Sequence, residues 1–398
     1  MTSRLSEIRL VLLGFGNVNQ ELCRIISTKS EQLRLCYGVN LNVVGVSDSR
    51  HALFNRKGFN LSSLVSTKQK EKTLESVASQ QSVSKYTDTL EMMSKNWSNF
   101  ELLVDSSPMN LQTGEPGLSC VRQALKRGKQ VVLANKSPLV VAFDELTTTQ
   151  DATKSCWIKY SATTCGGLPV INVITRDLMT NKNKPMCHLK KIEGIFNSTT
   201  NFILTQMFNH AKQSHKNTLA ENNGPIHKQQ HGSTFDRTLQ EAIRRGIAEA
   251  DPSNDIKGFD TCAKLYIILK SFGVRDIAFE KMKDQYTRGI DLVDDSLIQS
   301  ALRQGKVIRL IAKAFPQPQS TQTHPPWNIS VSPELVDEHS FLGRCEETDM
   351  CIQIETDLFD TISMKTNEWG VTPTAAAVLR DILSFVTDHT MQQQKAKL

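Results

Sequence analysis

The sequence predicts an α/β fold with a doubly wound, largely parallel sheet, and three observations carry this prediction. Up to about residue 160, short apolar runs alternate with amphipathic stretches, which is the pattern of β–α–β units. A Gly-x-Gly turn, Gly14 to Gly16, separates the first apolar run from the first amphipathic stretch. After Gly167 the pattern changes to longer helical stretches, so we expect a second domain from that point.

Each element of the first domain is predicted from its periodicity. The stretch after the first apolar run has apolar residues at Leu22, Ile25 and Ile26, and a later stretch has them at Val121 and Ala124. Spacing of three to four residues is typical of a helix that packs one face on a sheet. The expected strands are residues 8–13, 41–47, 100–105, 130–134 and 157–162.

The second domain is expected to be mixed. Residues 209–233 hold many Asn, His, Lys and Gln and almost no large apolar side chain, so we predict a mobile surface insertion. Four of the nine histidines lie there, but without the helical spacing of metal ligands, which favours a solvated loop over a metal site. The other expected elements are helices at 168–178, from near 199, and at 258–272, 296–303 and 372–387, strands at 189–196, 307–315 and 327–331, and a Pro-rich loop at 316–326.

Composition excludes several classes of protein. The chain has 398 residues, 39% hydrophobic and 22% charged, and no apolar run of the ~20 residues that a membrane helix needs. We therefore expect neither a membrane span nor a targeting segment. The net charge of +6 comes from dispersed basic residues, which suits a small anionic molecule better than nucleic acid. Nine scattered cysteines without a CxxC pair predict reduced thiols and a cytoplasmic location, with an organelle as the alternative.

The Gly-x-Gly turn predicts a dinucleotide site. Gly14 allows a tight turn after the strand, Gly16 lets a pyrophosphate approach the main chain, and the amides from Asn17 and Val18 onward start a helix whose dipole favours the phosphates. We assign Phe15 to the same loop. Asn19 stands where the fingerprint has its third glycine, and we expect its side chain to push the helix off the sheet and impair the site. A tight turn without a ligand is the alternative.

The end of the second strand leaves the choice of cofactor open. Asp48 is placed to accept a hydrogen bond from the 2′-hydroxyl of an adenine ribose, as in NAD sites. Ser49 and Arg50 follow it and are suited to a 2′-phosphate, as in NADP sites. The sequence therefore predicts NAD or NADP without deciding between them.

Six blocks, in the same order as in the family, resemble homoserine dehydrogenase: GFGNVN, VDSSP, VVLANKSPLV, IEGIFNSTTNFILTQM, IAEADPSNDIKGFDTCAKLYIIL and WGVTPTAAAVLRDIL. The resemblance implies a Rossmann-type nucleotide-binding domain, residues 1–158 with 367–398, and an α/β catalytic and dimerisation domain, residues 159–366. It also implies a homodimer that interconverts L-homoserine and L-aspartate 4-semialdehyde with NAD(P), in the pathway from aspartate to threonine, methionine and isoleucine. We expect a single-activity form without an aspartate kinase or C-terminal regulatory domain.

Several acidic and basic side chains are candidates for the chemistry. Asp260 and Lys264 are four residues apart, so one helix face carries both, and the spacing alone is equally that of a surface ion pair. By resemblance they are the catalytic pair, with Lys264 as the group that gives and takes the hydroxyl proton. Lys136 follows a strand end, where the ligand crevice of a parallel sheet lies, and by resemblance it approaches substrate and nicotinamide.

The resemblance assigns further residues to substrate and cofactor. Glu249 matches the carboxylate that holds the substrate ammonium, and Asp255 assists it or, like Asp251, shapes the loop. Ser106 and Ser107 end a strand near the nicotinamide ribose or phosphate, and Gly370 marks the C-terminal turn against the cofactor. A plain strand-end turn is the alternative for these last positions.

One block departs from the family pattern. Ser161 stands where the family has a glutamate, in a segment whose main-chain carbonyls bind sodium. The carbonyls of Ser161, Thr164, Gly166 and Leu168 still suit a sodium ion, because they do not depend on the side chain. Cys165 in this segment raises a second hypothesis, an acylating aldehyde dehydrogenase with a thioester on that cysteine. A third hypothesis is a catalytically impaired homologue that binds dinucleotide and has a regulatory role.

Overall fold

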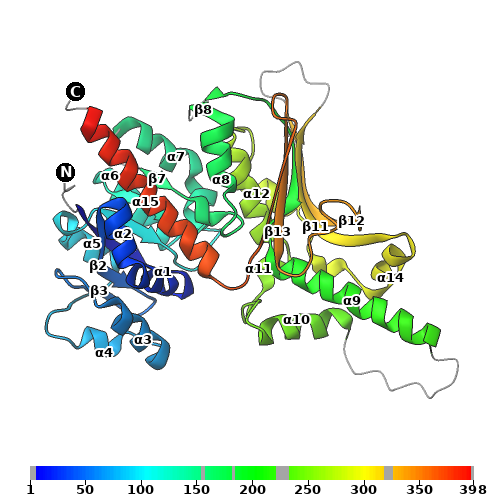
Figure 1. Ribbon diagram of the computed structural model, residues 1–398, viewed down its shortest axis with the longest axis horizontal. Helices are drawn as coiled ribbons and strands as arrows, with labels where there is room; N and C mark the ends of the chain where they lie inside the picture. The colour runs from blue at the N-terminus through cyan, green and yellow to red at the C-terminus, as the bar shows by residue number, and fades with distance from the viewer. Residues whose placement is uncertain (1–5, 154–156, 182–183, 221–232, 318–325, 396–398) are drawn as a thin grey trace. The chain divides into compact units, whose positions relative to one another are not determined.

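The computed structural model describes residues 6–153, 157–181, 184–220, 233–317 and 326–395, and the chain divides into two compact units (Figure 1). Unit 1 is Met1–Gly167 with Val371–Leu398, and unit 2 is Leu168–Gly370. The predicted boundaries after residues 158 and 366 therefore precede the observed ones by nine and four residues. None of the described helices is long and apolar enough to cross a membrane.

Unit 1 contains a seven-stranded sheet with the order β4-β3-β2-β1-β5-β6-β7. The predicted parallel sheet is confirmed, because β1 pairs in parallel with β2 and β5, and β6 pairs in parallel with β5 and β7. Strands β3 and β4 were not predicted; each has only three residues, too few for a periodic pattern, and they add an antiparallel edge. The strands are β1 Ser6–Leu13, β2 Val39–Ser47, β3 Ala52–Phe54, β4 Ser84–Tyr86, β5 Leu102–Asp105, β6 Gln130–Leu133 and β7 Ile158–Lys159.

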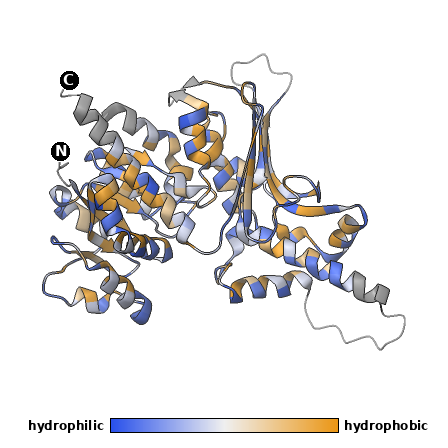
Figure 2. Ribbon diagram, viewed as in Figure 1, coloured by the Kyte–Doolittle hydropathy of each residue, from blue (hydrophilic) through white to orange (hydrophobic). Residues whose placement is uncertain are grey.

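The helices of unit 1 include one from each end of the chain. The C-terminal helix α15 lies beside α1 (Figure 1), and its buried Ala375, Val378 and Ile382 join Leu10 and Leu22 in one apolar core. Apolar and polar residues alternate around these helices (Figure 2), as expected for helices with one face on a sheet. The helices are α1 Asn17–Thr28, α2 Ser30–Tyr37, α3 Leu61–Glu71, α4 Glu75–Ala78, α5 Thr89–Lys95, α6 Gly117–Lys126, α7 Ser137–Thr153 and α15 Thr372–Lys395, with 3-10 turns at Trp97–Asn99 and Ser161–Thr163.

Unit 2 is built on a five-stranded antiparallel sheet with the order β12-β11-β10-β13-β14. Helices α9 (Ser198–Ala220), α12 (Phe259–Ser271) and α14 (Asp295–Arg303) contact β11, the strand next to the central β10. Strand β14 ends the sheet, and its residues alternate between exposed and half-buried. The strands are β10 Leu189–Ile195, β11 Lys306–Pro316, β12 Trp327–Asp337, β13 Asp349–Thr356 and β14 Thr361–Asn367, with a separate pair β8 Met179–Asn181 and β9 Lys184–Pro185.

The predicted helices of unit 2 at 168–178, from near 199, and at 258–272 and 296–303 are present, and the structure adds helices that were not predicted at 234–244, 253–256 and 279–286. The helices are α8 Val170–Asn172, which continues as a π-helix over Val173–Leu178, α9 Ser198–Ala220, α10 Thr234–Arg244, α11 Ser253–Ile256, α12 Phe259–Ser271, α13 Phe279–Tyr286 and α14 Asp295–Arg303, with a 3-10 turn at Ile290–Leu292.

Two predictions of local structure are wrong. The expected loop at 209–233 begins too early, because α9 continues to Ala220; residues 221–232 lie outside the described part of the chain. Extending an existing helix costs far less than starting one, so a polar sequence continued the helix where the apolar pattern had ended. The expected strand at 157–162 is only Ile158–Lys159, and a 3-10 turn follows it.

Candidate active site

The carboxyl ends of β1 and β5 meet at the centre of the unit 1 sheet, where the order of strand connection reverses. In doubly wound sheets ligands bind at such a point. Gly14 follows β1 with φ +78°, and a Cβ there would lie 2.5 Å from the Cα of Ser107. The Ser106 hydroxyl donates to the Gly14 carbonyl at 2.9 Å. Only glycine fits this turn, because the chain after β5 packs directly on it.

The start of α1 is open. A Cβ on Gly16 would meet nothing within 4 Å, and no side chain caps the helix. The first turn holds no acidic residue, and Gly16 and Asn17 are exposed. Free amides at a helix start with open space before them suit a phosphate group, so this turn fits a dinucleotide.

Phe15 and Asn19 do not behave as predicted. The Phe15 ring is buried and its amide donates to the Ser47 carbonyl at 2.7 Å, so neither is available to a ligand. The Asn19 amide nitrogen donates to the carbonyls of Leu13 at 3.1 Å and Gly14 at 3.0 Å. Asn19 thus ties the helix to the strand end instead of pushing it away, because its buried amide satisfies main-chain carbonyls at the turn.

Asp48, at the end of β2, is held by groups that the sequence did not identify. Its carboxylate accepts hydrogen bonds from the amides of Arg50 and His51, both at 2.9 Å, and from Lys68 of α3 at 2.5 Å. Burial raises the pKa of Asp48, but the bonds from Lys68 and the two amides outweigh it, and the pKa is lowered. Ser49 and Arg50 are exposed. Lys68 lies twenty residues along the chain, so no local pattern could reveal its contact with Asp48.

Lys136 follows β6 and is half-buried, directly before α7. The neighbouring Asn135 is buried and donates to the side chains of Asp105 and Ser107. Sequence reasoning missed both Asn135 and Asp105.

Gly370, the last residue of unit 2, has φ +73° and open space at its Cβ position, so glycine is needed there for the turn and not for packing.

In unit 2, Lys264 and Asp260 form a buried ion pair on α12. The Lys264 Nζ lies 2.7 Å from Asp260 Oδ2, and the two side chains are only 11% and 8% exposed. Lys264 also donates to the carbonyl of Phe196, the residue after β10, at 2.6 Å. The alternative of a surface ion pair is therefore wrong. A lysine with two short contacts to a carboxylate and a carbonyl is held in one position, as a proton-transferring group must be.

Asn197 joins this pair to a second carboxylate, that of Asp255. Its Nδ2 donates to Asp255 Oδ1 at 2.7 Å and to Asp260 Oδ2 at 2.9 Å, while its Oδ1 accepts from the Thr200 amide at 2.8 Å in the first turn of α9. Sequence reasoning missed Asn197. An asparagine between a buried strand and a helix start is a capping signal, and the family block IFNSTTN contains it.

Glu249 and Asp251 lie on the segment between α10 and α11, and both are exposed. This segment is fastened to α9, because the Thr199 hydroxyl donates to the Ile247 carbonyl at 3.0 Å. Asp251 accepts from the amide and hydroxyl of Ser253 and so shapes the turn before α11. The structure thus gathers Asp255, Asp260 and Lys264 around Asn197, and leaves Glu249 at the surface.

A family model for homoserine dehydrogenase matches residues 169–383, more than half of the chain. The chain belongs to the homoserine dehydrogenase family. A second model, for glutamate, leucine, phenylalanine and valine dehydrogenases, matches residues 1–107, the part that holds the Gly-x-Gly turn. The predicted family and its enzyme class, an oxidoreductase, are confirmed.

Relatives cover nearly the whole chain. A homoserine dehydrogenase of Methanocaldococcus jannaschii is 27% identical over 94% of this chain and 97% of the relative. An NAD(+)-dependent homoserine dehydrogenase of Pseudomonas canavaninivorans is 25% identical over 98% and 99%. A crystal structure from Archaeoglobus fulgidus, of a chain assigned as a homoserine dehydrogenase, has a TM-score of 0.72 at 27% identity and covers 95% of this chain and 99% of that one. These comparisons give no support to the alternative functions.

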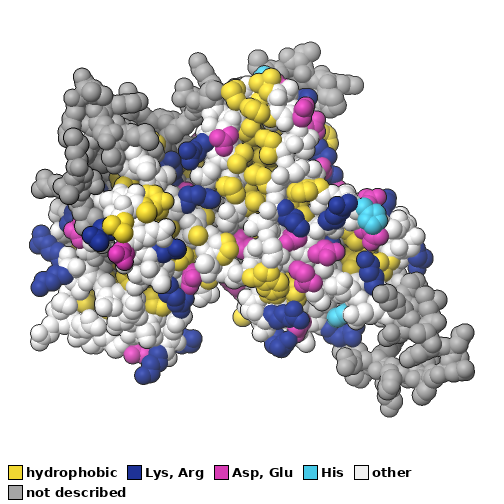
Figure 3. Space-filling view, viewed as in Figure 1, with side chains coloured by type: hydrophobic (Ala, Val, Ile, Leu, Met, Phe, Trp, Pro, Cys, Tyr) yellow, Lys and Arg dark blue, Asp and Glu magenta, His cyan; other side chains and the backbone are white. Residues whose placement is uncertain are grey.

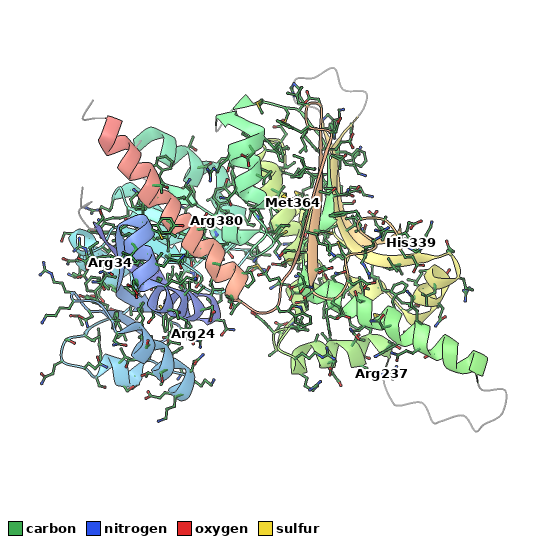
Figure 4. All side chains as sticks on the ribbon, in the orientation of Figure 1. Arg24, Arg34, Arg237, His339, Met364 and Arg380 are labelled. Carbon is green, nitrogen blue, oxygen red and sulfur yellow. The ribbon has the colours of Figure 1, made fainter. Side chains whose placement is uncertain are left out.

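Ser161, the position that departs from the family pattern, is hydrogen-bonded within unit 1. Asp381 of α15, buried, accepts from the amide and the hydroxyl of Ser161, each at 2.8 Å. Arg380, labelled in Figure 4, donates to the same hydroxyl at 3.1 Å. Burial raises the pKa of Asp381, and the hydrogen bonds from Ser161 lower it by less. A carboxylate therefore reaches Ser161 from the C-terminal helix.

Cys165 does not suit the acylating mechanism. Its side chain is 0% exposed, and the residue is in the left-handed region with φ +53°. A nucleophilic cysteine must be reachable by a carbonyl compound, and a fully buried thiol is not. Among the described residues, no group of three or more His, Cys, Asp or Glu side chains is placed to hold a metal ion.

Proposed function

We propose that the chain catalyses the reversible oxidation of L-homoserine to L-aspartate 4-semialdehyde with NAD or NADP. The observation that carries the proposal is the buried Lys264–Asp260 pair, joined to Asp255 through Asn197, in a chain of this family. The open turn at Gly16 supplies the second requirement, a place for the cofactor's phosphates. The reaction places this chain in the biosynthesis of amino acids from aspartate.

The residues of unit 1 hold the cofactor in this proposal. The amides of Asn17 and Val18 face the pyrophosphate, with Gly14 and Gly16 giving it room. Ser106, Ser107 and Lys136 follow β5 and β6 and serve the nicotinamide half. The nicotinamide, when bound, accepts or returns the hydride. Gly370 keeps its predicted place beside the cofactor as part of the proposal.

The adenine half of the cofactor site has groups for either cofactor. Arg50 and Ser49 are exposed and free to approach a 2′-phosphate, while Asp48 is engaged by Lys68. A carboxylate that already accepts from a lysine and two amides has less capacity left for a ribose hydroxyl. Both cofactors therefore belong in the assay.

The residues of unit 2 handle the substrate. The neutral amine of Lys264 takes the hydroxyl proton during oxidation, the ammonium so formed returns it during reduction, and Asp260 holds that ammonium in place. Glu249 binds the substrate ammonium, and Asp255, together with Lys136 of unit 1, assists in orienting the substrate. Glu249 is exposed and its carboxylate faces water, which leaves it accessible to a charged amino acid.

The test is a spectrophotometric assay of the purified full chain with L-homoserine and NAD or NADP, followed by the reverse reaction with the semialdehyde and the reduced cofactors. L-Serine, one carbon shorter, is the matched control substrate. Reduction of the cofactor with homoserine and not with serine is expected. Stoichiometric cofactor binding without turnover in either direction would instead favour the impaired regulatory homologue.

We also propose that a sodium ion binds to the main-chain carbonyls of Ser161, Thr164, Gly166 and Leu168. The Thr164 hydroxyl is buried without a hydrogen-bond partner among the described atoms, which favours a missing polar ligand in that turn. The Arg380 guanidinium beside Ser161 acts against a cation there. Melting curves in sodium, potassium and choline chloride test this proposal, and equal melting temperatures would contradict it.

We also propose a homodimer formed through the sheet of unit 2. Figure 3 shows a band of hydrophobic side chains over these strands. Ile362 and Met364 of the end strand β14 are half-buried, and Leu335 of β12 is 49% exposed. Apolar side chains on an end strand are typical of an interface. Light scattering on the full chain and on Met364→Lys tests this, and a monomeric wild type would contradict it.

The cytoplasmic location expected from the cysteines also remains a proposal, to be checked by imaging the tagged chain.

A further inference from the structure

Asp105 is a buried carboxylate to which the proposed reaction gives no role. It is the last residue of β5, paired with Leu13 of β1 on one side and Leu133 of β6 on the other. It is 0% exposed, and in the described part of the chain no lysine or arginine forms an ion pair with it. A buried carboxylate without a cation is unfavourable unless several donors satisfy it, so its surroundings must supply them.

Three donors converge on Asp105. Its Oδ1 accepts from the amide of Ser107 at 2.9 Å and from the hydroxyl of the same residue at 2.6 Å. Its Oδ2 accepts from Asn135 Nδ2 at 3.2 Å. Asn135 in turn donates to the Ser107 hydroxyl at 3.0 Å and accepts from the Ser137 amide at 3.0 Å. One carboxylate thus holds the loop after β5 to the loop after β6.

The same carboxylate sets the position of these loops against the Gly-x-Gly turn. The main chain of Ser107 packs where a Cβ of Gly14 would be, at 2.5 Å, and Ser106 bonds the Gly14 carbonyl. On the other side, a Cβ on Gly117, the first residue of α6, would lie 2.3 Å from Asp105 Oδ2. The carboxylate is therefore enclosed, and a shift of Ser107 is transmitted directly to Gly14.

We propose that Asp105 is a positioning residue for cofactor binding, acting through Ser107 and Asn135, and that only its ionised form keeps the three loops in place. The proposal rests on the proposed function, because Gly14, Ser106, Ser107 and Lys136 are the cofactor residues that it positions. A carboxylate accepts all three hydrogen bonds, whereas a carboxylic acid turns one oxygen into a donor that faces another donor.

The pH range of this effect follows from the surroundings of Asp105. Burial raises its pKa to about 6, against the hydrogen bonds from Ser107 and Asn135, which lower it. On the neighbouring helix α6, the Cys120 thiol responds to the charge of Asp105: burial raises the pKa of Cys120, and the charges of Asp105, Glu115 and Asp88 raise it further. Cys120 therefore stays neutral, and Asp105 gains a proton as the pH falls through about 6.

The experiment measures the dissociation constant of NAD by calorimetry on the full chain between pH 8 and pH 5. NAD is used because it lacks a 2′-phosphate that would itself titrate. All proteins carry His51→Gln, which removes the imidazole beside Asp48 from the pH profile. We expect the dissociation constant to rise about tenfold on acidification, the equivalent of one lost buried hydrogen bond.

Asp105→Asn should bind NAD about tenfold more weakly already at pH 8, with no further change on acidification. Adding Asn135→Asp exchanges the amide and carboxylate, restores the hydrogen bonds and should recover tight binding at pH 8. Asp381→Asn is the matched control, because Asp381 is also a buried acid with a raised pKa but bonds Ser161 instead. Asp381→Asn should show the same pH dependence of the NAD dissociation constant as the protein that carries His51→Gln alone.

The experiment distinguishes failure of the proposed function from failure of the role proposed for Asp105. No binding of NAD or NADP at any pH would overturn the proposed function and this inference with it. Normal binding with a flat pH profile would overturn the role of Asp105 alone, even where Asp105→Asn does not fold. An unchanged dissociation constant in Asp105→Asn, or no recovery in the double variant, would equally refute positioning through Ser107 and Asn135.

Discussion

Replacing Lys264 by Met tests the centre of the proposed mechanism. Methionine keeps an unbranched apolar stem and a good helix propensity but has no ammonium group. In the structure this removes the 2.7 Å contact with Asp260 and the 2.6 Å hydrogen bond to the Phe196 carbonyl. Asp260 keeps the hydrogen bond from Asn197, at 2.9 Å.

We expect Lys264→Met to lose both stability and turnover. Breaking a buried ion pair by removing one partner costs about 3 to 5 kcal/mol of stability. Because Asp260 keeps the hydrogen bond from Asn197, we expect a loss of about 3 kcal/mol for Lys264→Met. For a unit the size of Leu168–Gly370 this lowers the melting temperature by roughly 6 to 12 °C. Loss of a general acid–base group lowers turnover by about 100-fold or more. Cofactor affinity should stay near that of the wild type, because the proposed cofactor residues lie mainly in unit 1.

The control is the double variant Lys264→Met with Asp260→Asn, which also removes the unpaired buried charge. We expect it to regain most of the lost stability and none of the lost turnover. Rate constants, cofactor dissociation constants and melting temperatures are measured together at a temperature where all variants are folded. If the double variant regained turnover along with stability, or if Lys264→Met turned over normally, Lys264 would be a structural residue and Lys136 the remaining lysine for proton transfer.

Three further predictions concern unit 1. Cys165→Ser should keep most of the activity, because the proposed route forms no covalent intermediate; a substrate-derived thioester on Cys165 in a mass spectrum would refute that route. Asn19→Gly should lower the free energy of unfolding by about 2 kcal/mol through the lost bonds to Leu13 and Gly14 and the glycine itself, without tighter cofactor binding; a stable variant with higher affinity would show that Asn19 impairs the site. Because the pKa of Asp105 is raised from 3.8 to about 6, the protonated form of this side chain stabilises the folded state. This stabilisation is fully present below pH 3.8 and is lost as the pH rises through 6. At pH 8 ionised Asp105 therefore costs up to roughly 3 kcal/mol relative to its protonated form, so the stability of the wild type relative to Asp105→Asn should be higher at pH 5 than at pH 8; an equal difference at both pH values would contradict this sign.

The sequence by itself determined the parts that depend on neighbouring residues. The alternation of apolar runs predicted the parallel strands of unit 1, and Gly14 and Gly16 predicted the turn between β1 and α1, because a tight turn and an open helix start need glycine whatever lies elsewhere. The spacing of Asp260 and Lys264 placed both on one face of a helix, and the ordered blocks indicated the family. Strands of three residues and helix ends without an apolar pattern lay beyond this reasoning.

Only the tertiary structure decided whether polar groups are paired, buried or free. Lys68 meets Asp48, Asp381 meets Ser161 and Asn135 meets Asp105 across 20, 220 and 30 residues of sequence. Such contacts follow from which strand ends and helices the fold brings together, and the local sequence contains no periodicity that records them. The same reason separates a surface ion pair from a catalytic one: the spacing of Asp260 and Lys264 is identical in both, and the packing around α12 excludes the water that would weaken their interaction.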